Sequence, residues 1–369
     1  MTSFNTLHFG DVHLGLGTNP TPRIINNIIK TIHPLIAKGN IKILFLQGDL
    51  FDSIIFLNNP YLYEINVWIA EIISLCAKHG TEIVILEGTP RHDRRQSQQF
   101  VTIAEILNAT RTVKYITDLS IHYHPSIKKY VLYIPDVCRD SADTVYNDVI
   151  NLLEAQNLKQ VDFAIVHGAF EYQLPIKDKH THQQIRYEEI VKDFISVSHV
   201  HRYSRNGKII APGSFDCTEH GLKGPFGAIK IHHTETDFTV ERVINKDPMP
   251  YLSFELSEDN AAWVEDEVKK ALSKADLIYK INVSIKTVLN AENKAFYEYL
   301  KRTYLDVRWT LNPLVSEVKH NEKIIETVVM PSIDITPNNI FSMTKDKLIR
   351  MGAKDIDATL TILREYIDE

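Results

Sequence analysis

The sequence predicts an α/β protein, and two observations carry this prediction. Over roughly the first 230 residues, short runs rich in β-branched and aromatic side chains alternate with segments of helical periodicity. Clusters of Asp and His directly follow these runs, at the place where an α/β sheet presents its ligand-binding side chains. The alternation indicates β-α-β crossovers and a mainly parallel sheet that is covered on both faces.

The predicted elements of this first domain, residues 1–246, follow from their apolar patterns. Short apolar runs predict strands at residues 6–9, 41–46, 82–86, 130–134, 163–166, 194–198 and 208–210, with a closing hairpin at 226–232 and 238–243. Apolar residues at helical spacing predict helices at residues 23–36, 60–78 and 98–108.

A second pattern begins after Lys246–Pro250, where prolines at two of five positions indicate a linker. Residues 251–330 show a strand-helix-strand-helix-strand order, which favours a small α+β domain. The expected strands are 252–256, 279–286 and 307–311, and the helices are 258–273 and 292–303. Residues 331–369 are expected to be helical, with Ser342 as an N-cap and Gly352 as a stop.

The composition excludes several classes of protein. A chain of 369 residues with 44% hydrophobic and 24% charged residues is typical of soluble globular proteins. No segment resembles a signal peptide or a membrane span. The net charge of -6 argues against a surface coated for nucleic-acid binding, although it allows a local basic groove. Cys76, Cys138 and Cys217 are odd in number and widely spaced, so a reducing cytoplasm is expected.

Five polar clusters follow predicted strands. They are Asp11-Val12-His13, Gly48-Asp49-Leu50-Phe51-Asp52, Gly88 to Asp93, His167, and Ser198-His199-Val200-His201. One such residue is usually a cap or a turn residue, but turn chemistry does not explain five successive clusters of carboxylates and imidazoles. Ligands of this kind without thiolates suit Mn²⁺, Fe²⁺ or Zn²⁺. A carboxylate shared by two cations would support hydrolysis of a phosphate ester.

The order of these clusters resembles that of the calcineurin-like metallophosphoesterases. Within that superfamily the chain is similar to the SbcD-type nuclease subunits of bacteria and bacteriophages, the partners of SbcC-type ATPases. His167-Gly168-Ala169-Phe170, Ala211 to Ser214 and Glu219-His220-Gly221 carry this narrower resemblance. The motifs cover residues 11–221, and beyond residue 250 the match is architectural only. The resemblance implies a β-sandwich flanked by helices, an α+β capping domain that recognises DNA, and a C-terminal segment that binds the ATPase.

The resemblance also implies the residues of the site. One metal would be held by Asp11, His13, Asp49 and His201, and Asp49 would bridge to a second metal held by His167 and His199. His92 would protonate or stabilise the leaving oxygen, Asp93 would orient the His92 ring, and Asp52 would fix the loop. The cofactors would be two divalent ions, Mn²⁺ before Mg²⁺.

The implied activities are 3′-to-5′ exonuclease action on duplex DNA and endonuclease action on single strands, in DNA repair and recombination. The implied assembly is a homodimer with an SbcC-type ATPase. Two alternatives stay open: a metallophosphoesterase of small phosphodiesters, and a DNA-end-binding scaffold subunit whose metal site has decayed.

The loop Gly88-Thr89-Pro90-Arg91-His92-Asp93 departs from the family pattern Gly-Asn-His-Asp, whose Asn supplies an oxygen to the second metal. If the loop is aligned on Gly88, Thr89 occupies the position of the Asn; if it is aligned on His92-Asp93, Arg91 occupies that position. Arg91 has no lone pair to offer a cation. Thr89 offers a neutral hydroxyl, or its own carbonyl. We therefore expect either a weaker second metal site or a direct contact between Arg91 and phosphate.

Overall fold

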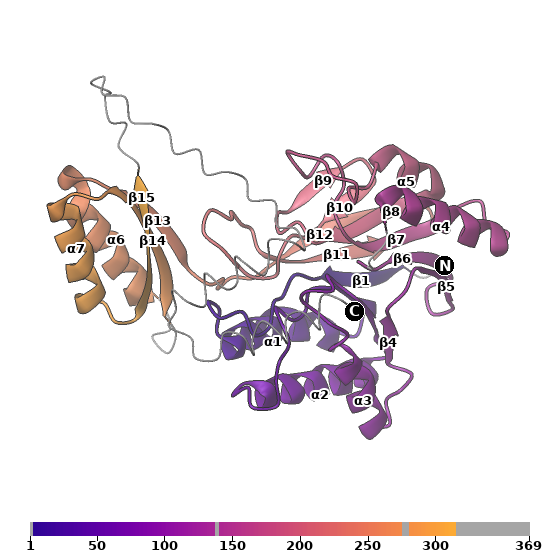
Figure 1. The fold of residues 1–369 in the computed structure, drawn as a ribbon. Helices are drawn as coiled ribbons and strands as arrows, with labels where there is room; N and C mark the ends of the chain where they lie inside the picture. The colour runs from indigo at the N-terminus through magenta and orange to yellow at the C-terminus, as the bar shows by residue number, and fades with distance from the viewer. Residues whose placement is uncertain (1–2, 137–139, 275–279, 315–369) are drawn as a thin grey trace, which may run out of the picture. The chain divides into compact units, whose positions relative to one another are not determined.

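A computed structural model describes residues 3–136, 140–274 and 280–314. Its first part contains two six-stranded sheets (Figure 1). The predicted C-terminal segment 331–369, with Ser342 and Gly352, lies outside the described residues, as does Cys138. The described helices include none that is long and apolar enough to cross a membrane.

Both sheets are mixed, with parallel pairs at the centre and antiparallel pairs at one or both edges. The first has the order β12 (Phe238–Ile244), β11 (Gly227–His233), β1 (Phe4–Phe9), β2 (Ile41–Gln47), β3 (Glu82–Leu86) and β4 (Val113–Ile116). The second has the order β5 (Ser120–His124), β6 (Lys129–Ile134), β7 (Val161–His167), β8 (Val191–Ser198), β10 (Ile209–Ala211) and β9 (Ser204–Asn206). The α/β class and the sandwich are thereby confirmed, whereas the expectation of one mainly parallel sheet is wrong.

Three apolar cores separate the layers of the sandwich. Strand β2 shows why, because Leu44 and Leu46 join the core under the helices α1 (Thr21–Ala37), α2 (Leu62–His79) and α3 (Gln98–Ile106). Its alternate residues Ile43 and Phe45 join the core between the two sheets. The second sheet buries its other face against α4 (Ala142–Ala155) and α5 (Gln184–Ile190). A strand buried on both faces reads as a continuous apolar run, which is the pattern at residues 41–46.

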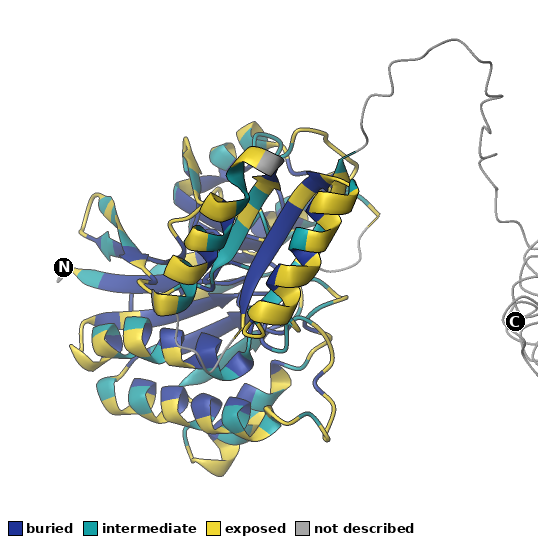
Figure 2. Ribbon diagram, turned by 90° about the vertical axis from the view of Figure 1, so that its left-hand side faces the viewer, coloured by how far each residue is buried: buried dark blue, intermediate teal, exposed yellow. Residues whose placement is uncertain are grey.

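Helix α1 illustrates how the outer layers are held. Ile24, Ile28, Ile32 and Ile36 recur every four residues and are almost fully buried. This spacing places them on one face of the helix. Each buried isoleucine contributes about 1.5–3 kcal/mol as an upper value. Figure 2 shows the same division, with buried strands and helices that expose only their outward faces.

Several elements were not predicted. They are β4, β5, β9, α4 and α5, all described above. The start of helix α4 has an N-cap residue, Ser141, whose hydroxyl accepts a hydrogen bond from the backbone N–H of Thr144. Serine is a common N-cap, so this start was recognisable in the sequence. The three strands have only three to five residues each, too few to show a reliable period.

The residues after the linker form the expected strand-helix-strand-helix-strand order. Three strands, β13 (Tyr251–Leu256), β14 (Ile281–Val288) and β15 (Val307–Leu314), are all parallel. Helices α6 (Ala261–Lys274) and α7 (Ala291–Thr303) contribute Val264, Val268 and Leu300 to one core with the sheet. Because both strand pairs among the described residues of this unit are parallel, these residues have α/β topology rather than the predicted α+β topology.

The two sheets of the sandwich meet where their central parallel strands end. Gly48 follows β2 in the first sheet, and His167 ends β7 in the second. A Cβ on Gly48 would lie only 2.4 Å from the His167 Nδ1 atom, and the Gly48 φ is +83°. Only glycine tolerates both the contact and the backbone angle. This close approach brings polar loops from both sheets together.

Candidate metal centre

One cluster of potential ligands gathers loops from both sheets. Asp11 and His13 follow β1, and His201 follows β8. Each offers a ligand atom, and these atoms all lie within 4.8 Å of one another. The Nε2 atoms of His13 and His201 are 3.1 Å apart. Two imidazole nitrogens and a carboxylate in this arrangement could hold one divalent cation.

A second cluster consists of Asp49, His167 and His199, whose ligand atoms also lie within 4.8 Å of one another. Asp49 follows β2, His167 ends β7, and His199 follows β8. The Asp49 Oδ2 atom is 3.3 Å from the His167 Nε2 atom. The other ring nitrogen of His167, Nδ1, meets the backbone carbonyl of Gln47 at 2.7 Å. That contact orients the ring with Nε2 toward the cluster.

The two clusters adjoin. The backbone N–H of His199 donates to both carboxylate oxygens of Asp11, at 3.1 and 3.0 Å. Burial lowers the pKa of His167, but the Asp49 carboxylate, together with Asp11 and the Gln47 carbonyl, more than offsets this and raises the pKa to about 10. Burial also opposes charge on His13, yet the carboxylates of Asp52, Asp11 and Asp49 raise the pKa of His13. Asp49 thus acts electrostatically on a histidine of each cluster.

The backbone of the centre is strained at four of the six predicted ligands. Asp11, His13, Asp49 and His199 have φ values of +48°, +53°, +49° and +111°. Positive φ is uncommon for residues with a Cβ and costs about 1–3 kcal/mol per position. Strain of this kind persists where the surrounding structure enforces it, and it concentrates at functional sites.

The rings of the first cluster are oriented by neighbours that are not themselves in it. The His13 Nδ1 atom lies 3.4 Å from the Asp52 carboxylate, in accord with the expectation that Asp52 supports the loop. The His201 Nδ1 atom lies 2.9 Å from the Thr218 hydroxyl. Each contact leaves Nε2 facing the cluster. Sequence reasoning missed Thr218, because a lone threonine far along the chain carries no motif.

In the loop after β3, His92 lies at the edge of the first cluster, whereas Asp93 is buried beneath the loop backbone. The His92 Nδ1 atom meets the backbone carbonyl of Asp52 at 2.5 Å, and His92 groups with His13 and Asp52 at the edge of the first cluster. The resemblance implied that Asp93 orients this ring, and the structure corrects that point. Asp93 is fully buried, and its carboxylate accepts three backbone N–H groups, from Gly88, Asp49 and Phe51.

Asp93 therefore fixes the loops after β2 and β3 against each other. Burial and the charge of Asp49 raise the pKa of Asp93 to about 7. Gly88 is required for this packing, because a Cβ there would lie 2.2 Å from the Asp49 nitrogen. In this same loop the Thr89 side chain points into the second cluster, whereas Arg91 is exposed.

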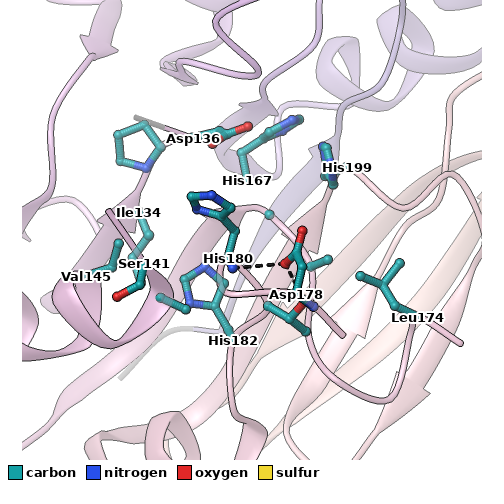
Figure 3. A pocket seen from close by; sticks show the side chains of 15 residues that line it. Ile134, Asp136, Ser141, Val145, His167, Leu174, Asp178, His180, His182 and His199 are labelled. Carbon is teal, nitrogen blue, oxygen red and sulfur yellow. Dashed lines mark hydrogen bonds between the residues drawn. The ribbon is translucent and has the colours of Figure 1, made fainter. Parts of the chain in front are cut away.

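A small cavity of about 110 Å³ opens beside the second cluster. Figure 3 shows His167 and His199 at one side of it and His180 with Asp178 at another. Asp136 and Ser141 also line its wall. The cavity gives a small molecule or part of a larger one access to the second cluster.

The donor set fits divalent cations. The candidate ligands are imidazole nitrogens and carboxylate oxygens, which suit Mn²⁺, Fe²⁺ and Zn²⁺. Cys76 and Cys217, the cysteines within the described ranges, are free and buried, and neither belongs to a cluster. The structure thus brings Asp11, His13, Asp49, His167, His199 and His201 together with His92 beside them.

Comparisons with known proteins provide no family. No family model and no curated protein matches the sequence. One solved crystal structure has 12% sequence identity and covers 66% of this chain and 100% of its own, with a TM-score of 0.38. The crystal structure of TT1561 of Thermus thermophilus has 10% identity, covers 66% of this chain and 100% of its own, and has a TM-score of 0.37.

Proposed function

We propose that the protein is a metal-dependent phosphodiesterase that acts on DNA, the nuclease subunit of an SbcCD-like repair and recombination complex. The observation that supports this most is the pair of adjoining clusters, each with one carboxylate and two imidazoles. Two divalent cations, Mn²⁺ before Mg²⁺, would generate a hydroxide from water and stabilise charge on the phosphate.

The residues would divide the work as follows. Asp11, His13 and His201 hold one cation, His167 and His199 hold the other, and Asp49 is shared. Asp49 belongs to the second cluster and its negative charge also favours a proton on His13 in the adjoining first cluster, which supports a shared role.

His92 would supply a proton to the leaving oxygen. Because the His92 Nδ1 atom is engaged by the Asp52 carbonyl, Nε2 is the atom available to a substrate. A protonated imidazole can donate its Nε2 proton to the leaving oxygen. The ring then becomes the neutral tautomer that keeps its proton on Nδ1, and this proton is still donated to the carbonyl. Asp93 acts at a distance, by holding the loop that carries His92.

DNA as the substrate follows from the motif resemblance and is tested directly. With Mn²⁺, we expect the full chain to shorten 5′-labelled duplex DNA from its 3′ ends and to cut single-stranded circles. His92→Gln should lose cutting yet keep DNA binding, measured by fluorescence anisotropy. Cleavage of a chromogenic phosphodiester without any action on DNA would favour a small-molecule enzyme. DNA binding without any metal-dependent cutting would favour a scaffold subunit.

The proposal includes a homodimer. Helices α2 and α3 border a groove, and Leu57, Tyr63 and Ile106 beside it are 93%, 76% and 72% exposed. A contiguous apolar surface of this kind is typical of an interface, and a second copy would bury it. Light scattering should give a dimer mass for the wild type and a monomer mass for Ile106→Glu. The proposed contact with an SbcC-type ATPase involves residues outside the described ranges.

A further inference from the structure

The Thr89 hydroxyl adds a fourth potential ligand atom to the three that Asp49, His167 and His199 offer, and the family pattern has no hydroxyl there. The Thr89 Oγ1 atom lies 3.1 Å from the Asp49 Oδ2 atom, 3.3 Å from the His167 Nε2 atom and 3.4 Å from the His199 Nδ1 atom. The hydroxyl is thus in contact with one potential ligand atom of every member of the cluster.

We infer that the Thr89 hydroxyl is a ligand of the second cation, in the place where the related nucleases have an asparagine amide. The inference rests on the proposed two-metal function and specifies how this chain completes that site. Thr89 is anchored for the task, because its backbone N–H donates to the Asp49 Oδ1 atom at 2.7 Å. A hydroxyl oxygen has two lone pairs, so it can face a cation while its hydrogen stays on Asp49.

The other two ways to fill the asparagine place lack this geometry. The Thr89 carbonyl already accepts the backbone N–H groups of His92, at 2.8 Å, and Asp93, at 3.1 Å. It therefore closes the turn rather than facing the cluster. Arg91 is exposed, and its carbonyl accepts a hydrogen bond from the Arg94 Nε atom. A guanidinium also has no lone pair for a cation.

A threonine hydroxyl in place of an asparagine amide affects which metal binds and how tightly it binds. A neutral hydroxyl is an accepted ligand of hard cations, as in the phosphate-binding loops whose Ser or Thr holds Mg²⁺. A hydroxyl oxygen is a weaker dipole than an amide carbonyl oxygen. The second cation is therefore held less tightly than the first, and its occupancy depends on the concentration of free Mn²⁺.

Calorimetric titration of the metal-free full chain with Mn²⁺ tests the inference, with bound Mn²⁺ counted independently by electron paramagnetic resonance. The wild type should bind two ions with unequal affinity, and His167→Ala should remove the weaker one. Thr89→Val keeps the shape of the side chain without its hydroxyl. It should weaken that site at least about tenfold and leave the tighter site within about twofold of the wild type.

Three further variants complete the design. Thr89→Ser keeps the hydroxyl and should match the wild type within about threefold. Thr89→Asn supplies an amide and should tighten the second site about tenfold. Arg91→Gln, the matched control in the same loop, should leave both affinities unchanged.

The inference is overturned if Thr89→Val binds both ions like the wild type, or if Arg91→Gln is the variant that weakens the second site. If Thr89→Val does not fold, Thr89→Asn decides alone, and an unchanged second site then refutes the role. A wild type that binds no Mn²⁺ at all would instead refute the two-metal function. The two failures are therefore distinguishable.

Discussion

Two groups of buried histidines in this protein have pKa values that shift in opposite directions. Between the sheets, burial lowers the pKa of His8 well below its usual value, and burial followed by the charge of Lys129 lowers the pKa of His233 to about 3. At the strand ends the pKa of His167 is instead raised to about 10 by Asp49, against the effect of burial.

The difference lies in what each ring faces. His8 and His233 both meet the Thr6 hydroxyl, at 2.8 and 3.0 Å, and His233 stacks on Phe4. These contacting neighbours are uncharged, and the more distant charge of Lys129 further disfavours a proton on His233, so the neutral imidazole is favoured in both cases. His167 faces a carboxylate that is itself buried, and such a pair attracts a proton or a cation. Burial of a histidine alone therefore does not indicate a ligand, whereas a buried carboxylate beside the ring favours that interpretation.

The largest expected effect is a loss of metal binding on substitution at the candidate metal centre, with no such loss on substitution in the core between the sheets. Asp49→Asn removes the carboxylate that we propose the two cations share. Losing several kcal/mol of stabilisation by the cations would lower the proposed activity by about a thousandfold or more. Calorimetry with Mn²⁺ should show the second ion lost. His233→Phe in the inter-sheet core should retain both ions, and loss of metal from that control would break the comparison.

The next effect is on stability. His8→Ala would leave a cavity between the sheets and should lower the free energy of unfolding by about 3 kcal/mol, because the ring is fully buried. His199→Ala at the exposed edge of the metal centre should change it by less than about 1 kcal/mol in metal-free protein. Urea denaturation measures both. Equal losses would show that the two regions do not differ in structural role.

A smaller effect concerns pH. The folded pKa of His233 is about 3, below the value of about 6.5 expected for the unfolded chain. Its contribution to stability is therefore complete above pH 6.5 and is lost as the pH falls, by about 1.4 kcal/mol per unit down toward pH 3. His233→Phe should reduce the slope of stability between pH 6 and 4.5 by that amount. An unchanged slope in urea denaturation would contradict the assignment.

The smallest effect is expected for a histidine that belongs to neither region. His180 is exposed at the cavity beside the second cluster. His180→Ala should alter the free energy of unfolding by no more than about 0.5 kcal/mol and should leave both Mn²⁺ affinities unchanged. A weakened second site in this variant would extend the metal centre beyond the six predicted ligands.

Much of this organisation could be predicted from the sequence, because it depends on local patterns. Strand β3 has the bounds that the apolar run at residues 82–86 predicted. The isoleucine spacing of residues 23–36 predicted α1. The six candidate ligands and His92 could be selected because carboxylates and imidazoles recur directly after strands. Their roles as ligands, and the domain boundaries, remain predictions.

Only the tertiary structure decided the points that depend on distant neighbours. An apolar strand does not reveal whether its second face meets helices or another sheet, so the two-sheet sandwich was not evident from β2 alone. Nothing near Thr218 in the sequence shows that its hydroxyl meets His201. Likewise, only the tertiary structure shows that the Thr89 hydroxyl points into the second cluster whereas Arg91 is exposed. Local spacing selects the residue types, but contacts across the sandwich assign their partners.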